Sequence, residues 1–331
     1  MHDTTLRRAQ AGDGDAFREL VEPHRRELLV HCYRILGSLD DAEDMVQEAL
    51  LAAWRAVGSF DGRALRAWLY RIATNRCLNH VRDEARRPPS MLPTEQARTM
   101  DGLAASDEPW WLEPCPDALL DDVALGPEAR YDAREAVALS FVAGLQHMPA
   151  QQRAVLVLRD VLGFTASEAA DILGTTPASV NSALARARAG FRPNRAPEQV
   201  PLPRSALEAD VVDRFVDAFQ RGDVDRVLGV LTMDARLYMP PEPVECRGSA
   251  AIAGFLRWRG FWGQGLGLIP TRANGQPAFG YYLCDPGTPV QRDSGVLVLD
   301  LSADRVSAMT RFGDGLLPRL GLPRALSRDG S

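Results

Sequence analysis

The stretch DDAEDMVQEALLAAW, from Asp40 to Trp54, decides how the first part of the chain is interpreted. Its apolar residues, such as Val46 and Leu50, recur at intervals of three and four, which predicts an amphipathic helix. Acidic residues and Gln47 fall on another side of that helix, and Ser38 is placed to cap its first turn. A charged helix face is usually only solvated. On its own, this stretch therefore leaves a binding role and a solvated surface both open.

The composition sets the broad class of the protein. A length of 331 residues with 46% hydrophobic residues predicts two or three domains with substantial cores. The polar start, Met1 to Thr5, and the lack of a long apolar run predict a cytoplasmic protein that does not bind membranes. Five scattered cysteines without a C-x-x-C pair argue against a disulfide framework and against a metal site. The net charge of −6 argues against a protein that coats nucleic acid by itself.

The helical stretch that follows is rich in arginine. Between Asp61 and Arg87, seven arginines stand against three acids, with aromatic and amide side chains among them. Contact with single-stranded or partly melted nucleic acid needs cations for phosphates, rings for unstacked bases and amides for base edges. An ordinary helix is an equally good explanation at this point, because Trp68 and Tyr70 can be core residues.

Two segments of unusual composition divide the chain. A pair of prolines ends the arginine-rich helix, and residues 88–129 form a linker with nine acids and one arginine. The adjacent Trp110 and Trp111 are unexpected in a plain acidic linker, which suggests that this part docks onto another surface. Residues 193–205 form a proline-rich tether.

Residues 130–192 carry the pattern of a helix-turn-helix. Thr165 and Glu168 form a T-x-x-E capping box, and a glycine ends that short helix. Thr176 then caps a second helix, with Pro177 at its first position. The second helix exposes Ser, Asn and Arg side chains, which favours DNA binding over an ordinary helical pair.

Beyond the tether, the sequence changes to an α+β pattern. Helices are predicted over residues 207–220, 224–231 and 249–258. Strands are predicted over residues 235–239, 266–272, 277–284, 295–301 and 305–312. Helices packed on a curved antiparallel sheet form an α+β domain with room for an interior cavity.

Together these segments resemble the extracytoplasmic-function group of bacterial sigma factors that carry a C-terminal SnoaL-like domain. The resemblance rests on DAEDMVQE (41–48), RAWLYRIATNRCL (66–78), LQHMPAQQRAV (145–155) and GTTPASVNSAL (174–184). WLEP (111–114) and PTRANGQPAFG (270–280) are similar to linker and tail motifs of that subgroup. Several motifs in one order cover nearly the whole chain, which is far more specific than any one of them.

The resemblance implies a multidomain protein with two all-α domains and an α+β domain. In chain order, the segments are a sigma region 2 helical bundle (5–87), the acidic linker (88–129), a region 4 helix-turn-helix (130–192), the tether (193–205) and a cone-shaped SnoaL-like domain (206–325). It further implies a promoter-specificity subunit that binds promoter DNA and core RNA polymerase, through the β′ clamp and the β flap, without a cofactor. The acidic linker would thread polymerase channels that are built to hold nucleic acid.

The resemblance also assigns roles to individual residues. The polymerase clamp would be bound by Asp41, Asp44, Gln47 and Glu48. The downstream (−10) promoter element would be bound by Phe60, Arg63, Arg66, Arg71, Asn75, Arg76, Asn79 and Arg82. The upstream (−35) element would be bound by Thr176, Ser179, Asn181, Ser182, Arg186 and Arg188.

The C-terminal domain admits a regulatory and an enzymatic interpretation. SnoaL-like folds include enzymes, which need a positioned acid or base, but residues 207–331 contain no His and no acids at catalytic spacing. We therefore expect no catalytic residue and a domain that regulates the sigma factor in cis. Arg272 or Asn274 could hold an unidentified small ligand or fasten the domain to the rest of the protein, and either could equally be a structural residue.

Two other classes of protein remain open at this stage. One is a one-component transcription regulator whose tail senses a ligand, which would bind a palindrome as a dimer without polymerase. The other is a SnoaL-like enzyme with DNA-binding appendages. The acidic helix favours the sigma factor, because binding to free DNA has no use for an acidic face.

Overall fold

The computed structural model describes residues 2–84, 103–105, 111–120, 135–191, 200–259, 266–284 and 290–327. The chain divides into two compact units. The first unit combines Met1–Pro88 with Ala118–Asn194, and the second combines Pro89–Asp117 with Arg195–Ser331. Within the described part, no helix is long and apolar enough to cross a membrane.

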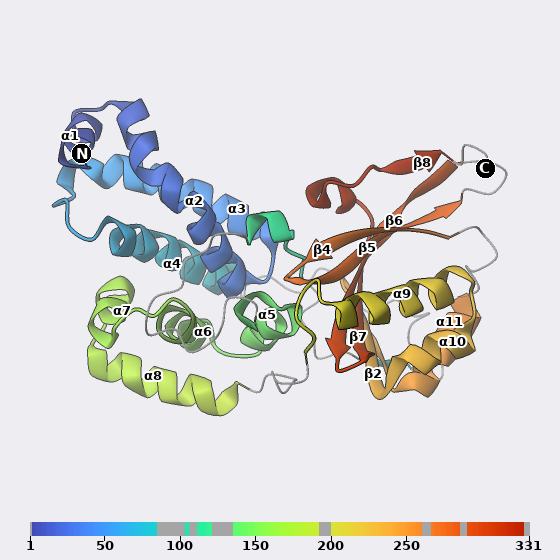
Figure 1. Ribbon diagram of the computed structural model, residues 1–331. Helices are drawn as coiled ribbons and strands as arrows, with labels where there is room; N and C mark the ends of the chain where they lie inside the picture. Colours follow the sequence, from blue (N-terminus) through green and yellow to red (C-terminus); the bar gives the residue numbers. More distant parts are fainter. Residues whose placement is uncertain are drawn as a thin grey trace. The chain divides into compact units, whose positions relative to one another are not determined.

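The first unit is built from helices (Figure 1). Four of them precede the linker: α1 (His2–Gln10), α2 (Gly14–Leu36), α3 (Leu39–Ala56) and α4 (Leu65–Glu84). The later part of the unit holds α5 (Leu139–Gln146), α6 (Ala150–Leu156), α7 (Ala166–Leu173) and α8 (Pro177–Gly190). A π-helical turn, Val157–Val161, continues α6.

Helix α2 is longer than the sequence pattern indicates. Pro23 is typical of a helix break, but a single helix runs from the Asp13 cap to a left-handed Gly37, with Pro23 inside it. A proline in a helix interior costs about 3 kcal/mol. The buried side that runs from Phe17 to Leu36 outweighs this cost, because an interruption would expose much of it.

The helix caps predicted for the helix-turn-helix are all present. Thr165 and Glu168 form the capping box, and Gly174 ends α7 in the left-handed conformation at φ +62°. Thr176 accepts a hydrogen bond from the Ser179 N–H, and Pro177 opens α8. The local sequence therefore accounts for the helix-turn-helix geometry.

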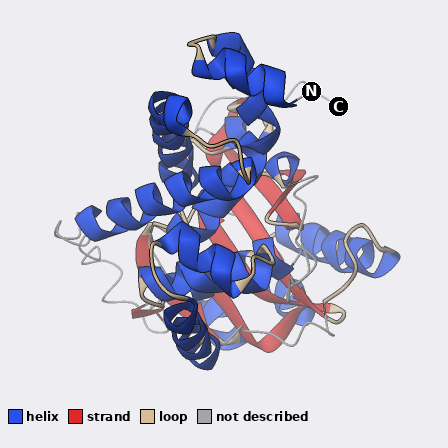
Figure 2. Ribbon diagram, turned by 90° about the vertical axis from the view of Figure 1, so that its left-hand side faces the viewer, coloured by secondary structure: helices blue, strands red, loops and turns tan. Residues whose placement is uncertain are grey.

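The second unit contains a twisted sheet, whose strands are red in Figure 2, and helices that pack on it. Its helices are α9 (Ala206–Gln220), α10 (Val224–Val230) and α11 (Ser249–Arg259). The strands are β1 (Leu103–Ala105), β2 (Leu231–Met239), β3 (Glu242–Arg247), β4 (Gly267–Ala273), β5 (Gln276–Cys284), β6 (Val290–Ser302), β7 (Arg305–Phe312) and β8 (Ala325–Ser327). The strand order is β1-β3-β2-β7-β6-β5-β4, with β8 paired to β6 and the β2–β7 pair parallel.

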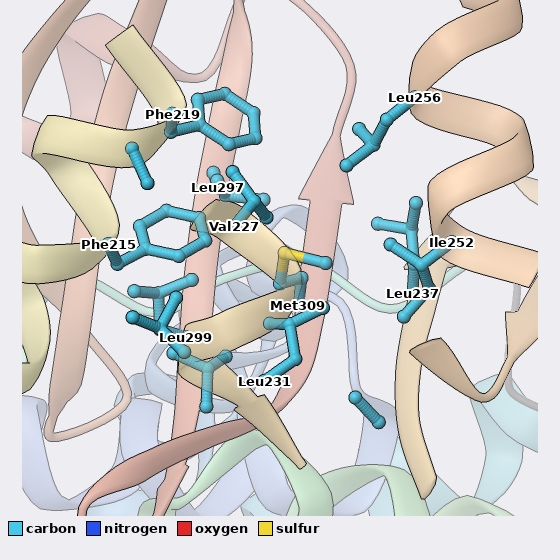
Figure 3. Close-up of a cluster of buried hydrophobic side chains, with 14 of the residues drawn as sticks. Phe215, Phe219, Val227, Leu231, Leu237, Ile252, Leu256, Leu297, Leu299 and Met309 are labelled. Atoms are coloured by element: carbon cyan, nitrogen blue, oxygen red, sulfur yellow. The ribbon is translucent and has the colours of Figure 1, made fainter. Parts of the chain in front are cut away.

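An apolar cluster fills the space between the sheet and its helices (Figure 3). Phe215 and Phe219 come from α9, Ile252 comes from α11, and Leu297 and Leu299 come from β6. These side chains are buried, which makes the cluster the main stabilising feature of this unit. The expected α+β architecture is confirmed.

Three strands were not expected from the sequence: β1, β3 and the short β8. β3 follows the Pro240–Pro241 pair directly, where the sequence pattern showed only a break. β1 lies inside the acidic linker and pairs antiparallel with β3, so that Leu103 stands opposite Cys246. The linker thus supplies the edge strand of the C-terminal sheet, which its acidic composition does not predict.

Candidate functional site

The acidic face predicted for α3 is present and lies on the surface. Asp44, Gln47 and Glu48 are exposed, and Asp41 is half-exposed. The buried stripe on the opposite side includes Ala42, Met45, Val46, Ala49 and Ala53. Because the acidic side chains do not contribute to the core, they are available to a partner.

The same exposed row continues to a residue that sequence reasoning missed. Leu51 follows Gln47 by four residues, and its exposed fraction is 55%. A large apolar side chain in an exposed charged row is typical of a binding surface. Its helical spacing from Gln47 and Glu48 was the signal that could have identified it.

Helix α4 runs beside α3 and presents the arginine-rich surface. Arg71, Asn75, Asn79 and Arg82 are exposed at intervals of three or four residues, so they form one row. Arg63 is exposed just before the helix, where its N–H donates to Asp61. This row combines guanidinium and amide groups, the donors that phosphates and base edges accept.

Two contacts join the acidic row of α3 to α4. Arg76 Nη1 lies 3.6 Å from Glu48 Oε2, and His80 Nε2 lies 3.7 Å from Asp41 Oδ1. Both pairs are partly exposed, so each adds at most about 1 kcal/mol to stability. They show that the acidic row and the arginine-rich row adjoin on two helices that pack against each other.

Two residues predicted to contact the −10 element make contacts within the protein. Phe60 is buried, and its ring stacks on Trp68 with centroids 4.5 Å apart. Arg66 donates to Glu27 Oε2 at 2.8 Å, and its guanidinium lies 4.9 Å from the ring centroids of both Tyr70 and Phe164. Phe60 is therefore buried, whereas the Arg66 side chain is partly engaged and 34% exposed, and the contact of both with DNA stays a prediction.

Titratable groups surround Arg66. Burial opposes ionisation of Glu27, but hydrogen bonds from His24 and Arg66 outweigh it and lower the pKa of Glu27. Burial and the nearby charges of Arg34 and Arg66 lower the pKa of His31 to about 3. His31 is therefore neutral near pH 7, and its Nε2 hydrogen-bonds the Thr74 hydroxyl at 2.8 Å.

The predicted −35 residues lie where the sequence places them. Thr176 caps α8, and the remaining ones are exposed on that helix: Ser179, Asn181, Ser182, Arg186 and Arg188. Val180, Ala183, Leu184 and Ala187 form its buried side. The exposed side thus carries hydroxyl, amide and guanidinium groups, which match base edges and phosphates.

Arg188 also has a structural role. It makes a two-fold ion pair with Asp160, with Nε to Oδ2 at 2.8 Å and Nη2 to Oδ1 at 2.5 Å. The Asp160 side chain is only 3% exposed, so it depends on this partner. Within the part of the chain that the structure describes, Arg186 makes no such ion pair, so the two arginines of α8 differ in their structural role.

A buried arginine joins α6 to the end of α2. Arg153 donates to the Ile35 carbonyl, to Gln146 Oε1 at 2.5 Å and to the carbonyls of Gln146 and Met148. All of these acceptors are neutral, and burial lowers the pKa of Arg153 to about 10. Gln146 Nε2 in turn donates to the Arg34 carbonyl at 3.2 Å. The two helical parts of the first unit are therefore held together by charge-to-carbonyl hydrogen bonds.

Asn274 lies in the turn between β4 and β5 and binds the linker. It has φ +58° and Gly275 has φ +71°, as a two-residue Asn-Gly hairpin turn requires. Its side-chain oxygen accepts from the Cys115 N–H at 2.8 Å, and its own N–H donates to the Cys115 carbonyl at 2.8 Å. Asn274 and Cys115 are both fully buried. Arg272 binds Asp117, two residues further along the linker.

Among the described residues of the linker, Cys115 and Asp117 bind the β4–β5 turn of the C-terminal domain. Trp111 is 39% exposed, whereas the neighbouring Leu112 and Cys115 are buried. Trp110 lies outside the described residues. Most of the tether, residues 193–199, and much of the linker also lie outside them.

Family models match three segments of the chain. They are Sigma-70 region 2 over residues 20–87, Sigma-70, region 4 over residues 133–189, and a SnoaL-like domain over residues 212–289. The segments coincide with the arginine-rich helices, the helix-turn-helix and the C-terminal α+β unit.

Individual relatives agree with these matches. The ECF RNA polymerase sigma factor SigG of Mycobacterium tuberculosis is 43% identical over 319 residues, which cover 94% of this chain and 85% of the relative. The ECF RNA polymerase sigma factor SigW of Bacillus subtilis is 29% identical over 192 residues, which cover 56% of this chain and 92% of the relative. A crystal structure of the extracytoplasmic-function sigma factor SigJ of Mycobacterium tuberculosis has a similar fold, with a TM-score of 0.57 at 20% identity over 91% of this chain and 96% of that one.

Proposed function

Since this chain belongs to the extracytoplasmic-function RNA polymerase sigma factors, we propose that it contacts the β′ clamp of core polymerase with the exposed row of α3. The exposed row of α4 then opens and reads the −10 element, and α8 reads the −35 element while its domain contacts the β flap. The C-terminal SnoaL-like domain regulates these contacts in cis. The family directs transcription initiation, and the residue-level assignments are the new part of this proposal.

The observation that carries the proposal is the contact between Glu48 and Arg76. It holds an acidic row, suited to a basic protein surface, beside an arginine row suited to nucleic acid. A subunit that positions melted DNA against a polymerase needs both surfaces next to each other. A one-component regulator has no use for the acidic one.

The residues inside the C-terminal domain support the proposal that this domain regulates the sigma factor by contact rather than by catalysis. The interior between sheet and helices is lined by the apolar cluster. Asp300 lies between Leu299 and Leu301, and Thr310 follows Met309, so strand alternation turns both polar residues away from that interior. General acid–base catalysis needs an acid or base that faces the substrate. Among the cluster residues, Tyr281 carries a hydroxyl, which accepts a hydrogen bond from Arg311.

The proposed domain limits follow from these assignments. Region 2 comprises residues 5–87, region 4 comprises residues 130–192, and the SnoaL-like domain comprises residues 206–325. The relative SigW supports a cut before the last domain, because its match to this chain covers 92% of its own length but only 56% of this chain.

Run-off transcription with and without the last domain tests the regulatory part. A chain that ends after Arg204 keeps both promoter-reading surfaces, so we expect the same start site with a changed amount of transcript. Identical amounts from both proteins, over a range of concentrations, would contradict regulation in cis.

A further inference from the structure

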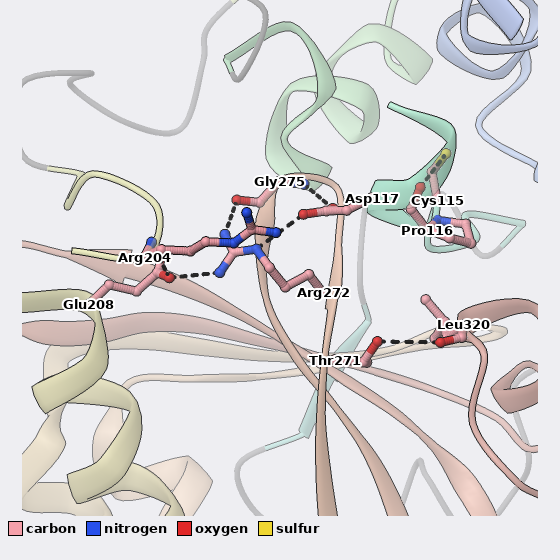
Figure 4. Close-up of polar contacts among 9 residues, drawn as sticks. All are labelled: Cys115, Pro116, Asp117, Arg204, Glu208, Thr271, Arg272, Gly275 and Leu320. Atoms are coloured by element: carbon pink, nitrogen blue, oxygen red, sulfur yellow. Dashed lines mark hydrogen bonds and ion pairs between the residues drawn. The ribbon is translucent and has the colours of Figure 1, made fainter. Parts of the chain in front are cut away.

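Arg272 is the centre of a polar network in which separate segments of the second unit meet (Figure 4). Its Nε donates to Asp117 Oδ2 at 3.1 Å, and its Nη1 donates to Glu208 Oε1 at 2.7 Å. Its Nη2 donates to the Gly275 carbonyl at 2.7 Å. The side chains are 18% exposed for Arg272 and 9% exposed for Glu208, so water screens these ion pairs only in part.

The Glu208 oxygen that binds Arg272 also binds the end of the tether. The Arg204 N–H donates to Glu208 Oε1 at 2.9 Å. Arg204 has φ +59°, a backbone conformation that a non-glycine residue adopts only when its surroundings hold it there. Ser205 caps α9 by accepting from the Glu208 N–H, which fixes the position of the carboxylate.

Asp117, in the linker, accepts hydrogen bonds from two residues of the C-terminal domain. Besides accepting from Arg272, its Oδ1 accepts from the Gly275 N–H at 2.7 Å. The pairing of β1 with β3 extends the contact with the linker back to Leu103. The C-terminal domain thus binds two described parts of the linker, residues 103–105 by backbone pairing and Asp117 by a charged side chain.

Asp117 and Arg204 are the two ends of one stretch of chain. Residues 118–203 run between them and contain the whole helix-turn-helix. Asp117, at one end, binds Arg272, and Arg204, at the other end, binds Glu208, which itself binds Arg272. The two ends of this stretch are therefore joined through the Arg272 guanidinium.

We propose that Arg272 is a coupling hub: it joins the linker and the tether in one network, so that the C-terminal domain releases both ends of residues 118–203 together. Loss of Asp117 from Arg272 weakens the hold of Glu208 on Arg204, because the three charges form one network. The consequence rests on the proposed function. A polymerase that takes up the acidic linker would also free the tether, and the −35-reading domain would gain reach.

The first test uses the full-length protein alone and measures amide hydrogen exchange. Asp117→Asn keeps the side-chain shape and an acceptor for Gly275, but removes the charge that pairs with Arg272. We expect exchange at the Arg204 amide to become about tenfold faster, although Asp117 does not touch Arg204, since a charged hydrogen bond is typically worth that factor or more. Asp225→Asn, in the exposed pair with Arg257, is the matched control and should leave Arg204 unchanged.

The result at Arg204 decides the proposal. Faster exchange there in Asp117→Asn, but not in Asp225→Asn, supports the hub. Exchange equal to that of the parent protein means that the linker and the tether are held independently, which overturns it. No polymerase is present, so this outcome does not depend on the proposed function.

The second test adds core polymerase. In Leu103→Cys, the new thiol stands opposite the native Cys246, and diamide should join them in the free protein. Ala104→Cys stands opposite Glu245 and is the control that should not cross-link. Slower cross-linking in the presence of polymerase supports linker release, and an unchanged rate in a protein that does bind polymerase overturns it. A protein that does not bind polymerase at all overturns the proposed function instead.

Discussion

The guanidinium of Arg66 lies 4.9 Å from the ring centroid of Phe164, so a residue of the region 4 segment, just before α7, packs against an arginine of α4, the helix that we propose reads the −10 element. Phe164 also packs edge-on against Tyr70, at 5.2 Å between centroids. The −10 and −35 elements are named for positions about 25 base pairs apart, which is roughly 85 Å of B-DNA. Domains in direct contact cannot hold both elements of a stiff duplex at once. We therefore expect this contact to open on the promoter.

Replacing Phe164 tests whether the contact restrains Arg66. Phe164→Leu keeps an apolar side chain but removes the aromatic face, which is worth about 1 kcal/mol to a cation. We expect binding of a fluorescent single-stranded oligonucleotide, measured by anisotropy, to tighten severalfold. Phe141→Leu is the control, because Phe141 packs on Phe191 at 5.0 Å and not on Arg66. Equal affinities of the two variants would contradict the restraint.

The two arginines of α8 should respond differently to truncation. Arg186→Ala should weaken −35 binding by roughly 1–3 kcal/mol if the side chain reads a guanine, with little change in thermal stability. Arg188→Ala leaves the buried Asp160 unpaired, so we expect it to lower the free energy of unfolding by about 3 kcal/mol. Binding assays and thermal unfolding of both variants check this. An unchanged free energy of unfolding in Arg188→Ala would contradict the structural role of Arg188. Unchanged −35 binding in Arg186→Ala would contradict the binding role of Arg186.

Leu51 should contribute to polymerase binding although it is not charged. Its exposed side chain would be buried against the clamp, so Leu51→Ala should lower the affinity for core polymerase by about 1–2 kcal/mol. Folding should not change, since Leu51 lies outside the core. Met233→Ala, an exposed apolar residue of the C-terminal unit, is the matched control. Unchanged affinity, measured by titration with labelled core enzyme, would remove Leu51 from the surface.

The buried His31 predicts a pH dependence of stability. Its pKa falls from 6.5 to about 3 on folding, so the unfolded chain binds a proton over a range where the folded protein does not. This contribution to stability is complete above pH 6.5 and is lost as the pH falls towards 3, by about 1.4 kcal/mol per pH unit. Urea unfolding between pH 7.5 and pH 5.5 should therefore show a smaller loss in His31→Gln than in the parent. Equal losses would mean that His31 does not carry the effect.

Local sequence signals were enough for most of the fold. Ser38 caps α3, the Thr165–Glu168 box starts α7, and Gly174 ends it, as the residues predict. The exposed rows of α3, α4 and α8 also follow from helical spacing, which is why the candidate surfaces could be predicted before the structure.

Features that depend on distant partners could not be predicted. The single helix across Pro23 depends on burial along its whole length, and β1 forms only because β3 offers an unpaired edge. The covering of Arg66 by Phe164 and the joining of Arg272 to Asp117 bring together residues about 100 or more positions apart. Spacing within one helix contains no information about such contacts.

The most direct test of the account is transcription by an acidic-face variant. We predict that the parent protein, added to core RNA polymerase, directs initiation at defined positions on a promoter library, as mapped by RNA 5′ ends. The double reversal Asp44→Arg with Glu48→Arg should abolish this, because losing a close charged contact typically costs about 2–5 kcal/mol. Its fold should be intact, and the matched double reversal of Glu19 and Glu22, exposed on α2, should initiate normally. Initiation by the Asp44/Glu48 variant at the same positions and in the same amount would contradict the claim that this row of α3 engages the polymerase.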